Sequence, residues 1–457
     1  MRNIIHILSI LFAFLLCAGI SKAQVVSFAP PWDSHYTVDA VYPHYLSNGN
    51  GRYIFILNKT AWAYFACKNP EGYLEKAQEE GITTIRVVLE GRPYYDVLGW
   101  EQWPWGGTRN NPDYATINVK YWDEMEKRIR LAGEMGIGIV LTLYNELVFD
   151  ESMIDSQKFF WDTVIERLAK YTNILTWEIH NEYIGNEKFQ AAAANYLKKK
   201  DPYKRPVCSS DGTTDNAAGV HFDWMDLAIV HTCTGSTPLS IDNIAKLNEN
   251  GGTHHLRDWY QAVARNTRSH NKPAFNSESG REKRHRNDDP VHRRKQGWIF
   301  NASGCFWTHH SWDGCEGIDD MEYKAPGSEF LSNMRQFFES IPFWTLAPDY
   351  TVVQNLSPNL LFSTMSDPQR NHTISYICTL LTGGKSMSEK FQLRLPDGHY
   401  CISFISPISL ETIKKTYITS KSLGLITNID IPDFVDDILI HITLVEEKEK
   451  TLMPDTQ

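Results

Sequence analysis

Two glutamates stand at the ends of two strand-like stretches of the chain. Glu182 closes residues 176–182, an apolar-leaning run that ends in an Asn-Glu pair, and Glu278 closes residues 272–278. A pair of carboxyl groups can divide acid and nucleophile work when their surroundings hold one protonated and the other ionised. The sequence therefore predicts a paired-carboxylate enzyme, provided that the fold brings the two strand ends together.

Several residues near other strand ends are candidates to support the pair. Arg86 lies in the apolar run 82–89, where an unpaired charge would be costly, so we expect it to face an acid at the mouth and to stabilise the ionised Glu278. A structural salt bridge is the alternative role for Arg86. Asn181 is expected to donate a hydrogen bond to a substrate hydroxyl. Four more residues are candidates for substrate binding: Trp62, Asn145, His231 and Trp307. For the two tryptophans, filling the core is the open alternative to stacking against a ring.

The pattern between these residues alternates strand-like and helical segments. Eight strands are expected, at residues 53–57, 82–89, 137–144, 176–182, 205–211, 226–232, 272–278 and 304–309. Eight such strands predict a (β/α)8 TIM barrel, whose strand ends all open on one face. A doubly wound open sheet is the alternative, but it normally has a glycine-rich phosphate turn after its first strand, and this sequence has none there. Glu182 then ends strand four and Glu278 strand seven, across the mouth from one another.

The ends of the chain predict the domain organisation. Residues 1–23 read as a signal peptide, with Arg2, an apolar stretch at 4–20 and small residues before the cleavage point. An exported protein, periplasmic or extracellular, is expected. Leu16 is too large for the residue before a lipidated cysteine, which argues against an anchor at Cys17. No other stretch is apolar for 18 residues, so no membrane span is expected.

The mature chain divides into three further parts. We expect a barrel at residues 24–345, with an N-terminal arm at 24–50 packed over its base. Short alternating runs separated by turns then predict a small all-β sandwich domain at 346–447. A flexible tail is expected at 448–457.

Composition narrows the partners. The formal charge of −10 and pI near 5.9 argue against a nucleic-acid partner, and no cofactor or metal is predicted. Seven of the eight cysteines follow the leader. Cys305 with Cys315 and Cys208 with Cys233 could form disulfides, or the cysteines could be free buried thiols.

A basic run, REKRHRNDDPVHRR at residues 281–294, is unexpected on an acidic chain. Asp288-Asp289-Pro290 is typical of a helix start. Most of the basic side chains are therefore expected on a solvated loop and helix face. As an alternative, His292 or Arg293 leans over the site.

WEIHNE and FNSE resemble the strand-four and strand-seven motifs of clan A of the retaining glycoside hydrolases, which includes the family 5 cellulases. KTAWAYF, RPYYD and HRRKQGWIFNASGCFWTHHSW resemble the apiosidase-like barrels, and LRLPDGHYCISFISPIS is similar to the sandwich that follows them. The resemblance implies a carbohydrate substrate, Glu182 as acid/base, Glu278 as nucleophile, and retention of configuration.

The chain departs from these relatives at two places. Leu57-Asn58-Lys59 stands where they usually carry a Gly-Asp pair, and the residue two positions after His231 is not the tyrosine that many of them use to touch the nucleophile. Both departures leave the choice of sugar open.

Three functions remain to be distinguished. The first is a secreted glycosidase, for which a carboxylate separation of about 5–5.5 Å means retention and about 6.5–9.5 Å means inversion. The second is a carbohydrate-binding protein with an inactive barrel. The third is a metal-dependent hydrolase, whose candidate histidines are scattered: His221, His231, His254, His255 and His309.

Overall fold

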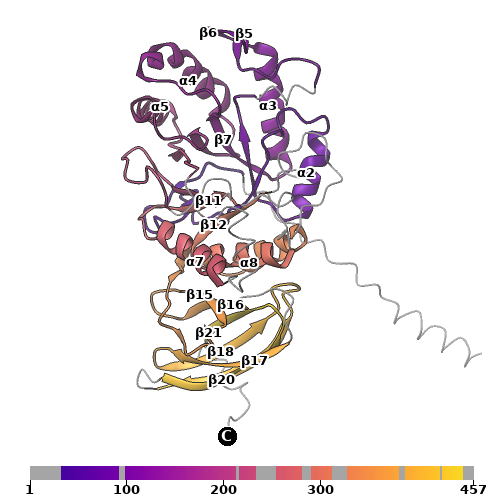
Figure 1. The fold of residues 1–457 in the computed structure, drawn as a ribbon, viewed down its shortest axis with the longest axis vertical. Helices are drawn as coiled ribbons and strands as arrows, with labels where there is room; N and C mark the ends of the chain where they lie inside the picture. The colour runs from indigo at the N-terminus through magenta and orange to yellow at the C-terminus, as the bar shows by residue number, and fades with distance from the viewer. Residues whose placement is uncertain are drawn as a thin grey trace, which may run out of the picture. The chain divides into compact units, whose positions relative to one another are not determined.

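A parallel barrel and a set of antiparallel sheets make up the described chain. The computed structural model describes residues 32–91, 98–212, 216–232, 254–279, 290–310, 327–379, 386–421 and 425–445. Figure 1 shows the barrel strands with helices around them, followed by the strands of the C-terminal region. The predicted fold class, a TIM barrel followed by an all-β domain, is confirmed. The leader and Cys17 lie outside the described residues.

Eight parallel strands form the barrel. Their order around the sheet is β10-β11-β12-β3-β4-β7-β8-β9. Their bounds are β3 (Leu57–Thr60), β4 (Thr84–Val88), β7 (Gly138–Tyr144), β8 (Ile174–His180), β9 (Val207–Cys208), β10 (Ala228–His231), β11 (Ala274–Glu278) and β12 (Cys305–His309). The barrel is nearly closed, because Asp226 joins the edge strands: its backbone N–H donates to the Val207 carbonyl at 2.8 Å, and its carboxylate accepts from the Val207 N–H.

Helices follow the strands and cover the outside of the barrel. They are α2 (Pro70–Glu79), α3 (Val119–Glu134), α4 (Ile154–Leu168), α5 (Glu187–Lys200), α7 (His254–Arg268), α8 (Pro290–Asn301) and α9 (Leu331–Glu339). Local sequence sets their ends. The Asn118 side chain caps α3 by accepting from the Tyr121 N–H, and Gly136 follows that helix with φ of 74°, a conformation that suits glycine. A two-stranded ribbon, β5 (Trp105–Thr108) and β6 (Asn111–Ile117), precedes α3.

The first barrel strand lies later in the chain than the sequence predicts. We expected residues 53–57, but β3 begins at Leu57 and takes in the polar residues that follow. Asn58 donates to the Thr308 hydroxyl at 3.0 Å and accepts from the Thr84 hydroxyl, while Lys59 pairs with the buried Glu80 at 2.6 Å. The prediction was wrong because these polar groups are satisfied by neighbouring elements, which makes a polar strand tolerable inside the fold.

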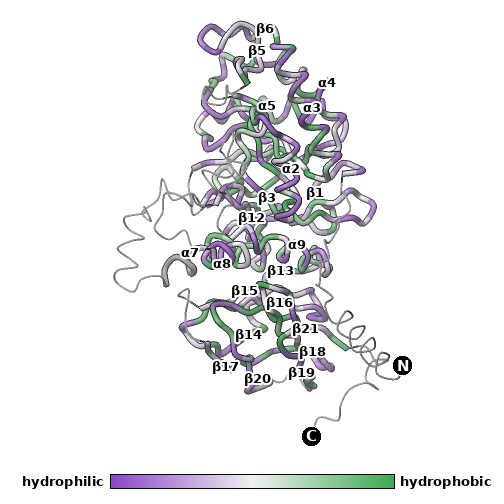
Figure 2. The backbone as a smooth tube through the Cα atoms, turned by 90° about the vertical axis from the view of Figure 1, so that its right-hand side faces the viewer, coloured by the Kyte–Doolittle hydropathy of each residue, from purple (hydrophilic) through white to green (hydrophobic). Residues whose placement is uncertain are grey.

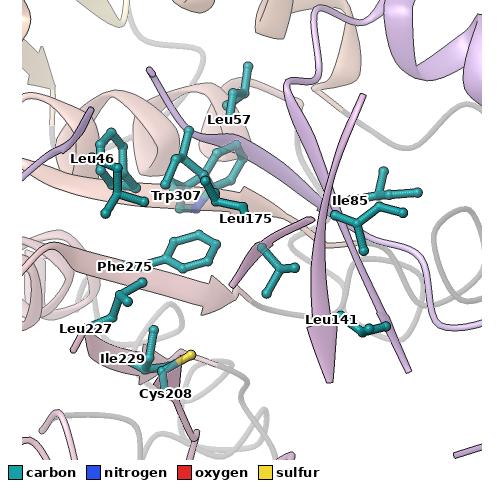
Figure 3. Packing of buried hydrophobic residues seen from close by; sticks show 14 of the residues in the cluster. Leu46, Leu57, Ile85, Leu141, Leu175, Cys208, Leu227, Ile229, Phe275 and Trp307 are labelled. Carbon is teal, nitrogen blue, oxygen red and sulfur yellow. The ribbon is translucent and has the colours of Figure 1, made fainter. Parts of the chain in front are cut away.

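Apolar side chains fill the rest of the barrel region. Figure 3 shows members of this cluster, including Leu57, Ile85 and Phe275, each on its own strand. The N-terminal arm joins the cluster with β1 (Thr37–Val38) and β2 (Leu46–Ser47). Trp32 presses against the start of β7 so closely that a Cβ on Gly138 would lie 2.0 Å from its ring. Trp32, Tyr36, Tyr45 and Leu46 of this segment are all buried in the cluster.

The C-terminal region consists of two antiparallel sheets. One has the order β13-β15-β16-β21-β18-β19 and the other β14-β17-β20. The strands are β13 (Ala347–Pro348), β14 (Val353–Gln354), β15 (Leu360–Ser366), β16 (His372–Thr379), β17 (Met387–Arg394), β18 (Gly398–Ile405), β19 (Thr412–Ser420), β20 (Leu425–Phe434) and β21 (Asp437–Leu444). A separate apolar cluster, with Val352, Phe391 and Ile440 among its members, lies between the sheets. Figure 2 shows hydrophobic stretches along these strands.

Three consecutive basic residues of α8, Arg293, Arg294 and Lys295, are buried and bind different partners. Arg294 binds Asp437 of β21 through two hydrogen bonds of 2.7 and 2.8 Å, and Lys295 pairs with Asp436 at 3.1 Å. The expectation of solvated basic side chains was therefore wrong for Arg293 and Arg294. Both donate hydrogen bonds to buried acceptors on other elements: backbone carbonyls for Arg293 and the Asp437 carboxylate for Arg294. Residues 281–289 lie outside the described ranges.

Cys208 and Cys305 are free thiols, as is Cys401. The free-thiol alternative therefore holds for the first two, while Cys233 and Cys315 lie outside the described residues. Among the described helices, none is both long and apolar enough to cross a membrane.

The Arg294–Asp437 pair gives a stability prediction. Asp437→Asn leaves the Arg294 guanidinium, 2% exposed, without its counter-charge, and we expect the free energy of unfolding to fall by about 3–5 kcal/mol. Urea unfolding measures the change. The matched control is Asp430→Asn, which breaks the exposed Lys390–Asp430 pair and should cost under about 1 kcal/mol. Equal losses in the two variants would contradict this account of the buried pair.

Candidate active site

The Arg86 guanidinium lies at the centre of the barrel mouth and is fully buried. Its Nε and Nη2 bind the two oxygens of Glu178 at 2.7 and 2.6 Å, and its Nη1 donates to Glu278 Oε2 at 3.1 Å. Burial opposes the charge, but the ion pairs with Glu178 and Glu278 raise the pKa of Arg86 above its ordinary value. The expected contact with Glu278 is present, and Arg86 also has a second acid that we did not predict.

Glu178, on β8, is held by four donors. Besides Arg86, the Thr142 hydroxyl donates to it at 2.6 Å and the Ser210 hydroxyl at 2.7 Å. Burial favours its neutral form, yet the pairing with Arg86 lowers the pKa of Glu178 below its ordinary value. Glu178 is therefore an ionised anchor for the arginine, with its lone pairs occupied.

Glu182 lies two residues beyond the end of β8, in an unusual backbone conformation. Its φ is 52°, the left-handed region that residues other than glycine rarely adopt. The Glu182 N–H donates to Ser210 Oγ at 3.0 Å, and the same oxygen accepts from Arg86 Nη2 at 3.2 Å. Ser210 thus ties the backbone of Glu182 to the Arg86–Glu178 pair and offsets part of the backbone strain.

Glu278 is the last residue of β11 and lies close to Glu182. One ligand atom from each of Glu182, His231 and Glu278 lies within 4.8 Å of the other two. His231, at the end of β10, has its Nδ1 3.0 Å from Glu182 Oε1 and 3.9 Å from Glu278 Oε2. Its Nε2 lies 2.9 Å from the Ser277 hydroxyl, which fixes the ring. The fold therefore brings the two predicted glutamates together, with a histidine between them.

His310 and Arg293 lie around the strand ends on the Glu278 side. His310 Nε2 is 3.9 Å from Glu278 Oε1, and its Nδ1 is 2.9 Å from the Thr60 hydroxyl. Arg293 of α8 donates to the carbonyls of Ser279 and His310, the residues that follow β11 and β12. Arg293 therefore lies behind the site and supports its backbone; it takes up neither of the two positions we had considered for it, on a solvated face or over the mouth.

Asn181 and Asn145 form one side of the site. The Asn181 amide accepts from Arg86 Nη2 at 2.8 Å and donates to the Asn145 side-chain oxygen at 2.9 Å. Behind them, Glu90 accepts hydrogen bonds from the backbone N–H groups of Asn145, Glu146 and Leu147. Glu90 thereby holds the loop after β7 in place. Both predicted asparagines lie beside the carboxylates.

The two predicted tryptophans differ in position. Trp62 lies against Arg86, with the guanidinium carbon 4.5 Å from the ring centroid, and is 3% exposed. Trp307 is fully buried in the apolar core and faces α8, since a Cβ on Gly297 would lie 3.0 Å from its ring. Trp62 supports the arginine by a cation–π contact. Trp307 fills the core, the alternative to stacking against a substrate ring.

A metal ion is compatible with the distances but not with the charges. In the described part of the chain, Glu182, His231 and Glu278 form the one group whose spacing could hold a cation. Arg86 lies 3.1 Å from Glu278 and would repel a cation there. Of the histidines considered for a metal, only His231 belongs to this group. The side chains of His254 and His255 are not among those described.

Sequence reasoning missed Glu178 and Ser210. The sequence did contain a signal for Glu178. Burying its carboxylate in a strand costs free energy, as burying the Arg86 guanidinium does, unless the two charges pair with each other. Ser210 follows β9 as one of two adjacent serines. Nothing in its local sequence marks it, since its importance comes from three groups on other elements.

Comparisons with known proteins support the fold and identify a family. A family model described as "Apiosidase-like, catalytic domain" matches residues 42–310. Among solved structures, one named "Glycoside hydrolase" is similar with a TM-score of 0.68 and 16% identity, covering 91% of this chain and 98% of its own. A glycoside hydrolase family 5 structure from Bacteroides vulgatus ATCC 8482 has a TM-score of 0.68 and 17% identity, covering 94% and 96%. No curated protein matches the chain.

Glu90 gives a pH-dependent prediction. Burial raises its pKa from 4.5 to about 7, although three backbone N–H groups oppose the shift. A raised carboxyl pKa stabilises the fold fully below the unfolded value and loses that contribution as pH rises through 7. Relative to Glu90→Gln, the wild-type protein should therefore lose about 3 kcal/mol between pH 4 and pH 8. Urea unfolding of both proteins across this range measures it; a constant difference would mean that Glu90 titrates normally.

Proposed function

Because the chain belongs to the apiosidase-like family, through the catalytic domain matched over residues 42–310, we propose that it hydrolyses O-glycosidic bonds with retention of configuration. Membership in this family and the barrel fold make it a homologue of glycoside hydrolases. The stereochemical course, the roles of the two glutamates and export from the cell are the proposed parts.

One observation carries the proposal. A carboxylate oxygen of Glu182 and one of Glu278 lie within 4.8 Å of each other. A retaining site has its two carboxyl groups about 5–5.5 Å apart, whereas an inverting site needs about 6.5–9.5 Å to hold a water between them. The short separation supports direct attack by a carboxylate over attack by a water.

In the first step, Glu278 attacks the anomeric carbon while Glu182 donates a proton to the departing oxygen. Before the attack Arg86 lies beside Glu278 and favours its ionised form, the form that can attack. Glu182 is the more exposed of the two, with 31% of its side chain accessible against 3% for Glu278, as suits the group that meets a leaving sugar. The products are a covalent glycosyl ester on Glu278 and a free alcohol.

In the second step, water enters and Glu182 takes its proton. The resulting hydroxide-like oxygen attacks the anomeric carbon, the ester bond to Glu278 breaks, and the carboxylate regains its contact with Arg86. His231 lies 3.0 Å from Glu182 and keeps that carboxyl group oriented in both steps. The Asn181 amide has a second N–H besides the one given to Asn145, and we assign it to the hydroxyl beside the anomeric carbon.

Export completes the proposal. The first 23 residues have the charge, apolar stretch and small residues of a signal peptide. Cleavage after Ala23 would release a periplasmic or extracellular enzyme, where polymeric glycans are accessible.

The nucleophile can be tested by chemical rescue. Glu278→Ala should lower turnover of an aryl glycoside at least ~1000-fold, because no covalent intermediate can form. Sodium azide fits the vacated space and should restore turnover, giving a glycosyl azide of inverted configuration by NMR. Glu182→Ala should instead give an azide product of retained configuration. Rescue products of the same configuration from both variants would refute the assignment.

Ser210 can be tested as a positioning residue. Ser210→Ala removes the acceptor for the Glu182 N–H and a donor to Glu178, so kcat should fall about 10–100-fold with little change in KM. Ser303→Ala is the matched control. Ser303 is equally buried and is hydrogen-bonded to Ser363 and Tyr350, but it precedes β12 and so lies away from the C-terminal strand ends that carry the glutamates. We expect both variants to lose a similar amount of thermal stability. Only Ser210→Ala should lose kcat. Unchanged kcat in Ser210→Ala would exclude the role.

A further inference from the structure

A groove of about 790 Å³ lies between the loops that follow β7 and β8. One wall is formed by residues 148–152 and the other by residues 183–189. The Asn186 side chain donates to the Phe149 carbonyl at 2.7 Å and joins the walls. The volume is that of a site for a small-molecule ligand of several rings.

Both walls continue directly from the active site. The first follows the segment of residues 145–147, whose N–H groups Glu90 binds and whose Asn145 contacts Asn181. The second begins at Tyr183, the residue after Glu182, so the two Cα atoms are about 3.8 Å apart. The Tyr183 ring also contacts the His180 ring, with centroids 5.5 Å apart. The groove therefore starts on the Glu182 side of the carboxylate pair.

The side chains of the groove suit an uncharged sugar. Tyr183 and Val148 are 36% and 52% exposed and offer apolar surface to the C–H face of a sugar ring. Three carboxylates line the walls, Asp150, Glu151 and Glu187, against the single ammonium of Lys188, which is already paired with Glu151 at 2.7 Å. Carboxylates accept hydrogen bonds from hydroxyl groups and repel other carboxylates.

We propose that this groove binds the leaving-group part of the substrate, and that this part is a neutral oligosaccharide without uronic acid. The inference rests on the proposed function, since only the group that Glu182 protonates departs on this side. Chain-like glycans with uncharged sugars on the leaving side are then the substrate class. The three wall carboxylates disfavour oligosaccharides with uronic acids at those positions.

Direct binding tests the groove without turnover. Titration calorimetry on the full chain carrying Glu278→Ala would use neutral hexasaccharides prepared from mannan, xylan, glucan and galactan, with hexagalacturonate as the charged counterpart. We expect at least one neutral hexasaccharide to bind and hexagalacturonate not to bind. Adding Tyr183→Ala should weaken neutral binding about tenfold. Adding Glu151→Lys should allow hexagalacturonate to bind.

The matched control is Phe159→Ala, which removes an exposed aromatic ring from α4, outside the groove. It should leave the affinity unchanged. Equal binding of hexagalacturonate and neutral sugars, no binding of any neutral sugar, or equal effects of Tyr183→Ala and Phe159→Ala would overturn the proposal.

Separate outcomes identify which hypothesis fails. Neutral binding that depends on Tyr183, without hydrolysis of any glycoside by the wild-type protein, would keep the groove and reject the enzyme. Hydrolysis by the wild-type protein, with affinity independent of Tyr183, would keep the enzyme and reject the groove.

Discussion

The buried charge of Arg86 is the constraint around which the barrel mouth is arranged. A guanidinium with no exposed surface must be matched by acids and acceptors, or the fold cannot contain it. Glu178 supplies the full counter-charge through two hydrogen bonds, which leaves the Glu278 contact as a single longer one. This division matters: Glu278 is oriented by the arginine without being locked to it. A nucleophile needs that freedom, because it must leave the ion pair and return to it.

Much of the fold and the central pair of the site could be predicted from the sequence. Each barrel strand must be covered by a helix, so apolar runs alternate with amphipathic ones and the strand count follows. Once the count is eight, Glu182 and Glu278 must face each other at the mouth. The β3 bounds could not be predicted, because Asn58 and Lys59 are acceptable in a strand only when Thr308, Thr84 and Glu80 are present around them. Because these partners are distant in the sequence, the residues around Asn58 and Lys59 do not indicate that a strand forms there.

The two tryptophans and the basic run show the same limit for side chains. Trp62 follows β3 and Trp307 is the middle residue of β12; the first lies against Arg86 and the second against α8. Which way each ring points depends on the pleat of its strand and the path of the next loop, and a single sequence does not specify either. Arg293 and Arg294 looked solvated because their acceptors, the Ser279 and His310 carbonyls and Asp437, belong to other elements.

The apolar core has a consequence for how this chain can evolve. The cluster that fills the barrel extends without interruption to Met365, Tyr376 and Leu439 of the C-terminal sheets, and Trp298 of α8 stacks on Tyr376. Many multidomain proteins exchange their accessory domains by recombination at a linker. Here such an exchange would expose one face of α8. It would also leave Arg294 and Lys295 without Asp437 and Asp436, the acids that now pair with them. Replacing the C-terminal sheets would therefore require compensating changes in α8 as well.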